Sequence, residues 1–293
     1  MGDLAGGQLV RDNNRFSLFC DTALAQRQEA QKDADKAGIP SSRKDIFYHL
    51  FRGKDPETGL GYTQADLEAE TISLVIAGSD TSSVTLTACC FYLVHNGRVL
   101  NKLTKEIRSV FANIEDIRYA GTPLPTLSYL RACIDETLRM APPTPGHIPR
   151  EVGPGGATID GMMFPPGTVV GISTYALHHN EEYYPDSFTF SPERWIVDPA
   201  NHVSAESVAR AQSAFAAFGL GPRGCLGKNL AYMELSLALA RMLWQYDIRL
   251  MEGDKTGEGG PGKAWGRTRT EEYQLEDVWL VKRDGPVVEF RAR

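Results

Sequence analysis

The sequence lacks the long apolar stretches of a membrane protein and the paired cysteines of a small secreted protein. No run of 18 apolar residues occurs, so no transmembrane helix is expected. Residues 1–10 contain no apolar core of a signal peptide, and Gly6 stands where N-myristoylation needs Ser or Thr. The 5 cysteines form no C-x-x-C pair, which argues against a disulfide framework or a zinc site. These absences favour a cytosol-facing protein in a reducing compartment, with no membrane anchor in this chain.

An excess of positive charge is missing as well. The chain has 31 Lys and Arg against 37 Asp and Glu, a formal net charge of −6, so no general binding of nucleic acid is expected. A hydrophobic share of 42% and a charged share of 23% are ordinary for a soluble globular protein. The length of 293 residues allows one large domain or two small ones.

The most informative stretch is the loop 218–227, which reads Phe-Gly-Leu-Gly-Pro-Arg-Gly-Cys-Leu-Gly. Its glycines and proline disfavour helix and strand, and an apolar-periodic segment that predicts a helix follows at once. Cys225 therefore lies at or just before a helix N-terminus, where backbone N–H groups favour a thiolate. Glycines on both sides let the backbone approach a flat object closely, and Arg223 supplies a positive charge.

The loop admits two other interpretations. Gly219, Gly221 and Gly224 spell G-x-G-x-x-G, but a dinucleotide fingerprint must follow a strand, and residues 212–218 are rich in Ala rather than β-branched. Dinucleotide binding therefore stays a distant alternative. A buried structural cysteine in a turn is the second interpretation, and it is the usual role of a lone cysteine.

Five residues of the loop carry a family resemblance. Phe218, Gly221, Arg223, Cys225 and Gly227 fit the pattern F-x-x-G-x-R-x-C-x-G, which resembles the haem-binding signature of the cytochrome P450 family. The resemblance implies that Cys225 is the axial ligand of the iron in heme b, with the other four residues around the cofactor. A cysteine thiolate on haem iron pushes electron density towards the iron and favours O–O cleavage.

A second stretch supports the same family. Thr63 and Asp66 form an N-cap pattern for a long helix predicted over about residues 64–95, with a polar turn in its middle. Alone, this turn is read as a polar helix patch whose hydroxyls bond back to the helix. Residues 77–81 match the A-G-x-D/E-T motif of the family's oxygen-binding helix. The resemblance implies catalytic roles for Thr81 and Asp80 in orienting oxygen and relaying protons, with Ala77 and Gly78 beside the cofactor.

A third motif lies on a helix predicted over about residues 126–140. Glu136 and Arg139 stand three apart on one helix face, and such a pair usually lies on the surface, where it contributes little to stability. The sequence Glu-Thr-Leu-Arg resembles the family's E-x-x-R helix, and Pro192 to Trp195 resembles its P-E-R-W segment. The resemblance implies a buried structural network of Glu136, Arg139 and Arg194.

Further residues receive roles only through the resemblance. Thr144, Pro145, His147 and Ile148 belong to the segment that passes the haem and lines the substrate site. Arg150 joins Arg223 as a candidate for a haem propionate, because Arg suits bidentate contacts with carboxylates. The adjacent pair His178 and His179 has poor spacing for a metal site and is expected to be structural.

The expected fold is α+β and mostly helical, a single cytochrome P450 domain over residues 1–293 with small β-sheets. Helices are predicted for 12–36, 44–52 and 99–111, and strands for 148–151, 157–159, 168–172 and 247–251. Residues 198–206 are expected to be an irregular loop. Residues 273–291 are expected to be two strands joined at 283–285. Family members are longer at the N-terminus, so this chain is expected to be truncated, lacking the anchor by which eukaryotic relatives bind the endoplasmic reticulum, further propionate contacts and much of the pocket roof.

The predicted function is a haem-thiolate monooxygenase that uses O2 to hydroxylate or oxidise a small organic substrate. The amino-acid sequence of several segments resembles family members from fungal secondary metabolism. Electrons are expected from a separate reductase that uses NADPH and flavins, because the chain shows no module for either. The alternative is a truncated, non-catalytic remnant of the family with weak or no haem binding.

Overall fold

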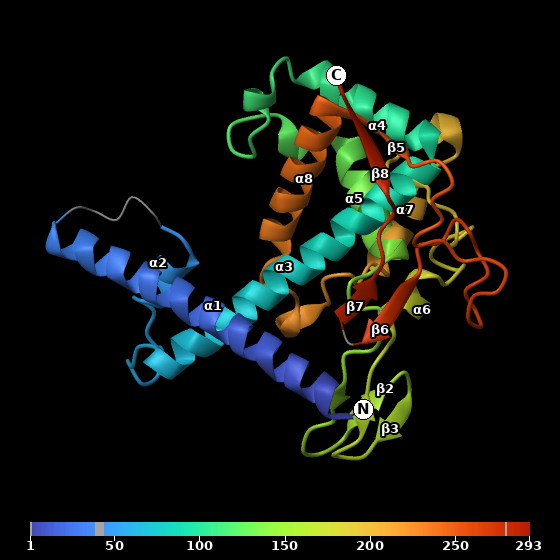
Figure 1. Cartoon of the computed structure of the whole chain (residues 1–293). Coiled ribbons are helices and arrows are strands. Elements are labelled where there is room, and N and C mark those ends of the chain that lie inside the picture. Colours follow the sequence, from blue (N-terminus) through green and yellow to red (C-terminus); the bar gives the residue numbers. More distant parts are fainter. Residues whose placement is uncertain (1, 39–43, 279) are drawn as a thin grey trace. The chain divides into compact units, whose positions relative to one another are not determined.

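A computed structural model describes residues 2–38, 44–278 and 280–293 and shows an α+β, mostly helical chain with small antiparallel sheets (Figure 1). This fold class agrees with the sequence prediction. The chain divides into two compact units, Met1–Ser79 and Asp80–Arg293. The division falls inside the long helix α3, Gln64–His95.

The first unit holds helices α1, Gly2–Lys36, and α2, Ile46–Leu50. Helix α1 begins earlier than the predicted residue 12, and α2 is shorter than the predicted 44–52. The carboxylate of Asp45 caps α2 by accepting from the Tyr48 N–H at 2.9 Å and binds the Arg27 guanidinium at 2.9 Å. This pair fixes α2 against α1.

Helix α3 has the bounds expected from the sequence, and a capping box starts it. Thr63 Oγ1 accepts from the Asp66 N–H at 3.2 Å, and Asp66 Oδ2 accepts from the Thr63 N–H at 2.8 Å. In the polar middle, Ser79 Oγ donates to the Val75 carbonyl at 2.7 Å and Thr85 Oγ1 to the Thr81 carbonyl at 2.9 Å. These are the backbone-directed bonds expected of hydroxyls inside a helix.

By length and composition, α3 could also cross a membrane, the one such helix in the described part of the chain. It passes this test without a run of 18 apolar residues, because a high mean hydropathy over a window tolerates a few charges. Core helices of soluble proteins pass the same test. The C-terminal half of α3 is of this kind, since Ala88, Cys89, Phe91, Tyr92 and Leu93 are fully buried.

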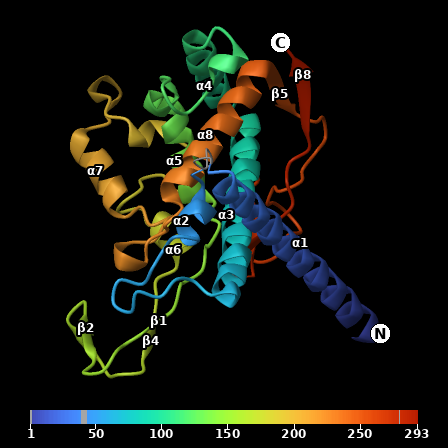
Figure 2. The same ribbon diagram turned by 90° about the vertical axis from the view of Figure 1, so that its left-hand side faces the viewer.

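In the second unit, helices α4, Gly97–Val110, α5, Ser128–Met140, and α8, Lys228–Gln245, build one hydrophobic core with the end of α3 (Figure 2). Their apolar faces meet there, because α4 buries Val99, Leu103 and Ile107 at helical spacing. Short helices complete the unit: η1 Ile114–Asp116, η2 Leu124–Thr126, α6 Thr174–His178, η3 Pro192–Trp195, η4 Pro199–Asn201, α7 Ala205–Ser213 and η5 Gly221–Arg223. Helix α7 begins inside the predicted irregular loop and was missed.

The strands of the second unit form two-stranded antiparallel sheets, and their bounds are β1 Arg150–Glu151, β2 Ala157–Ile159, β3 Met162–Phe164, β4 Val169–Val170, β5 Tyr246–Leu250, β6 Leu275–Val278, β7 Leu280–Arg283 and β8 Val288–Ala292. Strand β1 pairs with β4, β2 with β3, β5 with β8, and β6 with β7. Residues 273–291 contain three strands, β6, β7 and most of β8, rather than the expected two. The expected junction at 283–285 does lie between β7 and β8, but β8 pairs with β5, so that Ile248 lies opposite Phe290.

Candidate active site

The loop that carries Cys225 is a short turn between α7 and α8. Gly219 N–H donates to the Ala216 carbonyl at 2.9 Å, and Cys225 N–H donates to the Phe218 carbonyl at 2.7 Å. Gly227 is the N-cap residue of α8. The thiol of Cys225 is exposed, so the loop holds it by its backbone while the sulfur remains accessible at the start of a helix.

The surroundings of Cys225 fit a flat, apolar, iron-bearing group with acidic substituents. Gly219 and Gly221 have φ of +67° and +71°, and a Cβ on Gly221 would meet nothing within 4 Å. Leu220 and Leu226 are 69% and 99% exposed. Arg223, in η5, is exposed and carries a positive charge. A soft sulfur donor, open apolar surface and a neighbouring guanidinium are the groups that a haem needs.

The dinucleotide interpretation fails on the structure. The segment that leads into the glycines is helix α7, Ala205–Ser213, followed by turns, and not the strand that the fingerprint requires. Residues 216–225 instead form a turn closed by backbone hydrogen bonds, with the Cys225 thiol exposed.

The motif of residues 77–81 lies in the polar middle of α3. A Cβ on Gly78 would meet nothing within 4 Å, so the helix surface there is open, and Ala77 precedes it in the same turn. The side chain of Asp80 is exposed and that of Thr81 is partly buried. Ser83 Oγ donates to the Asp80 carbonyl at 3.0 Å. The backbone carbonyl of Asp80 therefore already accepts a hydrogen bond.

Two hydroxyls directly after Thr81 connect α3 to neighbouring elements of the second unit. Ser82 Oγ donates to Glu234 Oε2 of α8 at 3.2 Å, and Ser83 Oγ accepts from Arg283 Nη2 of β7 at 2.7 Å. The turn after Thr81 thus lies beside both the helix that follows Cys225 and the β6–β7 hairpin. Sequence reasoning missed both contacts, because their partners are remote in the chain.

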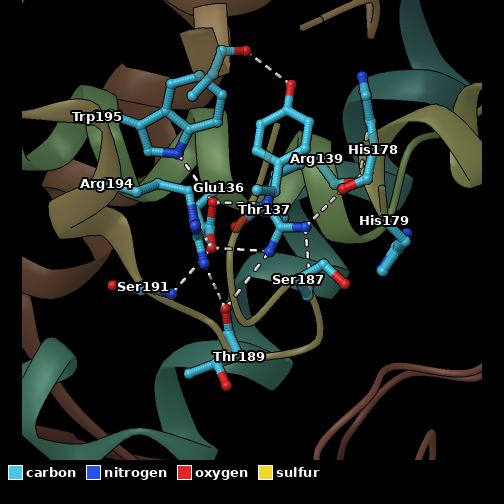
Figure 3. Close-up of polar contacts among 12 residues, drawn as sticks. Glu136, Thr137, Arg139, His178, His179, Ser187, Thr189, Ser191, Arg194 and Trp195 are labelled. Atoms are coloured by element: carbon cyan, nitrogen blue, oxygen red, sulfur yellow. Dashed lines mark hydrogen bonds and ion pairs between the residues drawn. The ribbon is translucent and has the colours of Figure 1, made fainter. Parts of the chain in front are cut away.

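The structure brings Glu136, Arg139 and Arg194 together in a buried network (Figure 3). Both side chains of the Glu136–Arg139 pair are 0% exposed, and two parallel bonds of 2.9 Å join them. Arg194 Nε donates to Glu136 Oε1 at 2.9 Å. Arg139 Nη1 also reaches the carbonyls of His178 and Ser187 at 2.8 and 2.7 Å. The surface interpretation of the i, i+3 pair is therefore wrong.

Two further donors complete the shell of Glu136 and were not anticipated. The Trp195 indole Nε1–H donates to Glu136 Oε2 at 2.9 Å, and the Ser191 N–H donates to Glu136 Oε1 at 2.9 Å. Burial alone would raise the pKa of Glu136, but the charges of Arg139 and Arg194 and these hydrogen bonds outweigh it and hold the pKa below its ordinary value. Glu136 is therefore an ionised carboxylate in a dry site.

The same P-E-R-W segment holds a second carboxylate against α4. Glu193 accepts from Arg98 Nη1 at 2.6 Å, from Lys102 Nζ at 3.1 Å and from the Tyr129 hydroxyl at 2.8 Å. Partial burial opposes ionisation, yet these donors lower the pKa of Glu193 to about 2. The segment η3 is thus pinned from both sides, to α5 by Glu136 and to α4 by Glu193.

The residues expected to line the substrate site follow α5. Pro145 is buried, and its carbonyl accepts from Ser173 Oγ and from the Tyr175 N–H, each at 2.9 Å. Thr144 is partly buried, whereas His147 and Ile148 are exposed. The segment lies against the β6–β7 hairpin, since the Val281 N–H donates to the Pro143 carbonyl at 3.2 Å.

The second propionate candidate, Arg150, lies in β1, and its guanidinium donates to the Pro149 carbonyl at 3.1 Å. Its side chain is exposed, so it is accessible to an anionic group. His178 and His179, expected to be structural, both direct Nδ1 to backbone carbonyls, at 3.1 Å from Arg139 and 2.9 Å from Tyr175.

Comparison with known proteins identifies the family. The family model for cytochrome P450 matches residues 8–262. The chain is 39% identical over 286 residues to a cytochrome P450 monooxygenase of Gibberella zeae, covering 97% of this chain and 62% of that protein. It is 40% identical to the cytochrome P450 monooxygenase AKT7 of Alternaria alternata, with 96% and 53% covered. Identity to apf7 of Gibberella fujikuroi, also a cytochrome P450 monooxygenase, is 44%, with 95% and 51% covered.

The chain thus spans between about half and two thirds of the length of these relatives. The match nevertheless includes the Glu136 network, the polar turn of α3 and the loop of Cys225. The chain belongs to the cytochrome P450 family.

Proposed function

We propose that this chain carries the haem-binding and oxygen-handling part of a monooxygenase that oxidises a small organic substrate. The observation that carries the proposal is the Cys225 loop, which presents an accessible sulfur at the start of α8 while Ser82 joins α8 to the turn after Thr81. The names of the relatives support the same activity. O2 is the co-substrate, and a separate reductase using NADPH and flavin supplies electrons.

Cys225 Sγ would hold the iron of heme b as a thiolate. The backbone bond from the Cys225 N–H to the Phe218 carbonyl fixes the direction of the cysteine, and Gly221 and Gly227 leave room for a planar ring. Arg223 and Arg150 would neutralise the propionates. The bound haem supplies the oxygen-activating chemistry.

Thr81 and Asp80 would deliver protons for the reaction. The Thr81 hydroxyl can donate and accept, so Thr81 Oγ1 would pass a proton that the exposed Asp80 carboxylate collects from solvent. Ser82 and Ser83, held by Glu234 and Arg283, fix the rotation of this turn. That anchoring keeps the turn that carries Thr81 in place.

Thr144, Pro145, His147 and Ile148 would contact the substrate. Their backbone is held by Ser173 and Tyr175 on one side and by the β6–β7 hairpin on the other. Exposed Ile148 and partly buried Thr144 offer one apolar and one hydroxyl contact, which suits a small organic molecule with a polar group. A substrate from fungal secondary metabolism agrees with the fungal sources of the relatives.

The test is a carbon-monoxide difference spectrum of the reduced protein, expressed with haem supplied. The expected result is a Soret band at the long-wavelength position of thiolate-ligated iron, lost in Cys225→Ser and kept in Cys90→Ala, which removes another thiol. The absence of the band from folded wild-type protein, or its persistence in Cys225→Ser, would overturn the proposal.

A further inference from the structure

His178 is fully buried and uses both ring nitrogens, on two different parts of the chain. Nδ1 lies 3.1 Å from the Arg139 carbonyl at the end of α5, and Nε2 lies 2.9 Å from the amide nitrogen of Ala216, just before the cysteine loop. A carbonyl can only accept and an amide N–H can only donate. The ring must therefore be the neutral tautomer with its proton on Nδ1.

The surroundings of the ring fix its position and keep it neutral. The ring stacks on Phe215 with a centroid distance of 5.4 Å and an interplanar angle of 7°, and it meets the edge of Tyr184. Burial, together with the nearby charge of Arg139, lowers the pKa of His178 to about 3 although the Arg139 carbonyl favours the proton. The backbone carbonyl of His178 also accepts from Arg139 Nη1 at 2.8 Å (Figure 3). His178 is thus bound to Arg139 through ring and backbone.

The acceptor Nε2 starts a series of bonds that ends at the cysteine. The Ala216 N–H donates to His178, the Ala216 carbonyl accepts from the Gly219 N–H at 2.9 Å, and the Phe218 carbonyl accepts from the Cys225 N–H at 2.7 Å. Phe215 stacks on the same ring. The direction in which Cys225 leaves the turn thus depends on where Ala216 is held.

We propose that His178 is a positioning residue for the thiolate ligand, which transmits the rigidity of the Glu136–Arg139 network to the Cys225 loop through the Ala216 amide. This inference rests on the proposed haem function for its consequence, but the contact between His178 and the loop is a property of the protein alone. Because the loop is exposed and rich in glycine, a buried anchor at its entrance reduces the conformations that its thiol samples.

Two substitutions separate the two ring contacts. His178→Asn keeps a donor near the position of Nδ1 for the Arg139 carbonyl but loses the acceptor for Ala216. His178→Gln places its carbonyl oxygen near the position of Nε2 and keeps that acceptor. His179→Asn is the matched control, since the neighbouring ring bonds to the Tyr175 carbonyl and makes no bond to the loop.

The first experiment measures amide hydrogen exchange in the haem-free protein. We expect His178→Asn to speed exchange at Ala216, Gly219 and Cys225 by roughly tenfold, the loss of one hydrogen bond, and His178→Gln to restore most of the protection. Equal protection in Asn and Gln variants, or an effect confined to Ala216, would overturn the inference. Should His178→Asn fail to fold, the wild-type protein decides: the three amides must open together as denaturant increases, and independent opening of Cys225 would refute the link.

The second experiment measures haem affinity by titration and the share of the ferrous carbon-monoxide complex with thiolate ligation. His178→Asn is expected to bind haem roughly tenfold more weakly with a reduced thiolate share, while His178→Gln and His179→Asn stay near wild type. If the wild-type protein binds no haem, the proposed function is refuted. The hydrogen-exchange result then decides whether His178 positions the loop. A wild-type protein that binds haem, with His178→Asn unchanged, would defeat the inference alone.

Discussion

Glu136 is 0% exposed and accepts two hydrogen bonds from Arg139 and one each from Arg194, Trp195 and Ser191. Cys225 is exposed, and a Cβ on Gly221, four residues earlier in the loop, would meet nothing within 4 Å. The first region has its polar groups paired within the protein, and the second is open to a ligand. Under the proposed function the first region stabilises the fold and the second performs the chemistry, so substitutions in the two should act on different observables.

The largest effect is expected at the centre of the network. Glu136→Ala leaves the buried guanidinium of Arg139 and the partly buried one of Arg194 without their carboxylate and should lower the free energy of unfolding by about 3–5 kcal/mol. Urea unfolding followed by circular dichroism measures the change, with Glu289→Ala as control. Glu289 pairs with Arg249 at the surface, so its removal should cost less than about 1 kcal/mol. Similar losses of unfolding free energy in the two variants would show that the Glu136 network does not stabilise the fold more than a surface ion pair.

The second-largest effect is expected from acid, which should lower the free energy of unfolding through the buried histidines. Burial lowers the pKa of His178 to about 3 and that of His179 to about 4 from an ordinary 6.5. Below pH 6.5 the unfolded chain takes up these protons while the folded protein does not. The free energy of unfolding should therefore fall as pH drops from about 6 to 4, by up to roughly 1.4 kcal/mol per pH unit for each histidine. His179→Asn should flatten this slope, and an unchanged slope would show that His179 does not titrate in this way.

A smaller loss is expected at Trp195. Trp195→Phe keeps the aromatic packing but removes the indole donor to ionised Glu136, which should cost about 1.5–3 kcal/mol. Trp244 donates to the neutral Phe111 carbonyl at 2.9 Å, so Trp244→Phe should cost only about 0.5–1.5 kcal/mol. Calorimetric melting of both variants checks the order, and a greater loss for Trp244→Phe would remove Trp195 from the network.

The smallest effect on stability is expected at Cys225, the proposed iron ligand. Cys225→Ser changes one exposed atom and should alter the free energy of unfolding of the haem-free protein by less than about 0.5 kcal/mol. Urea unfolding without haem measures it beside wild type. A loss of more than about 2 kcal/mol would place Cys225 among the structural residues.

The sequence predicted the elements whose signals are local. The Thr63–Asp66 box starts α3 as expected, and α8 follows the glycine loop. Helix α7 was missed because its N-cap, Ser204, lies in a polar stretch, and the helix buries little beyond Val208 and Ala211. The pairing of β8 with β5 was not predicted, because no local pattern reveals a partner so remote in the chain.

The site divides in the same way. The loop of Cys225 and the motif of Thr81 are contiguous in sequence, so their residues could be named in advance. The burial of Glu136 could not be deduced from its spacing to Arg139, because Trp195 and Arg194 close over it from a later segment. The contacts of His178 with Ala216 and of Ser82 with Glu234 join helices and turns that only the fold brings together.

The proposed binding of haem at the Cys225 loop is tested most directly by amide hydrogen exchange of the wild-type protein with and without haem. We expect haem to increase protection at residues 218–227 and in the polar middle of α3, while residues 128–140 around Glu136 exchange equally slowly in both states. Protection that appears elsewhere and leaves the Cys225 loop unchanged would show that haem does not bind at this loop.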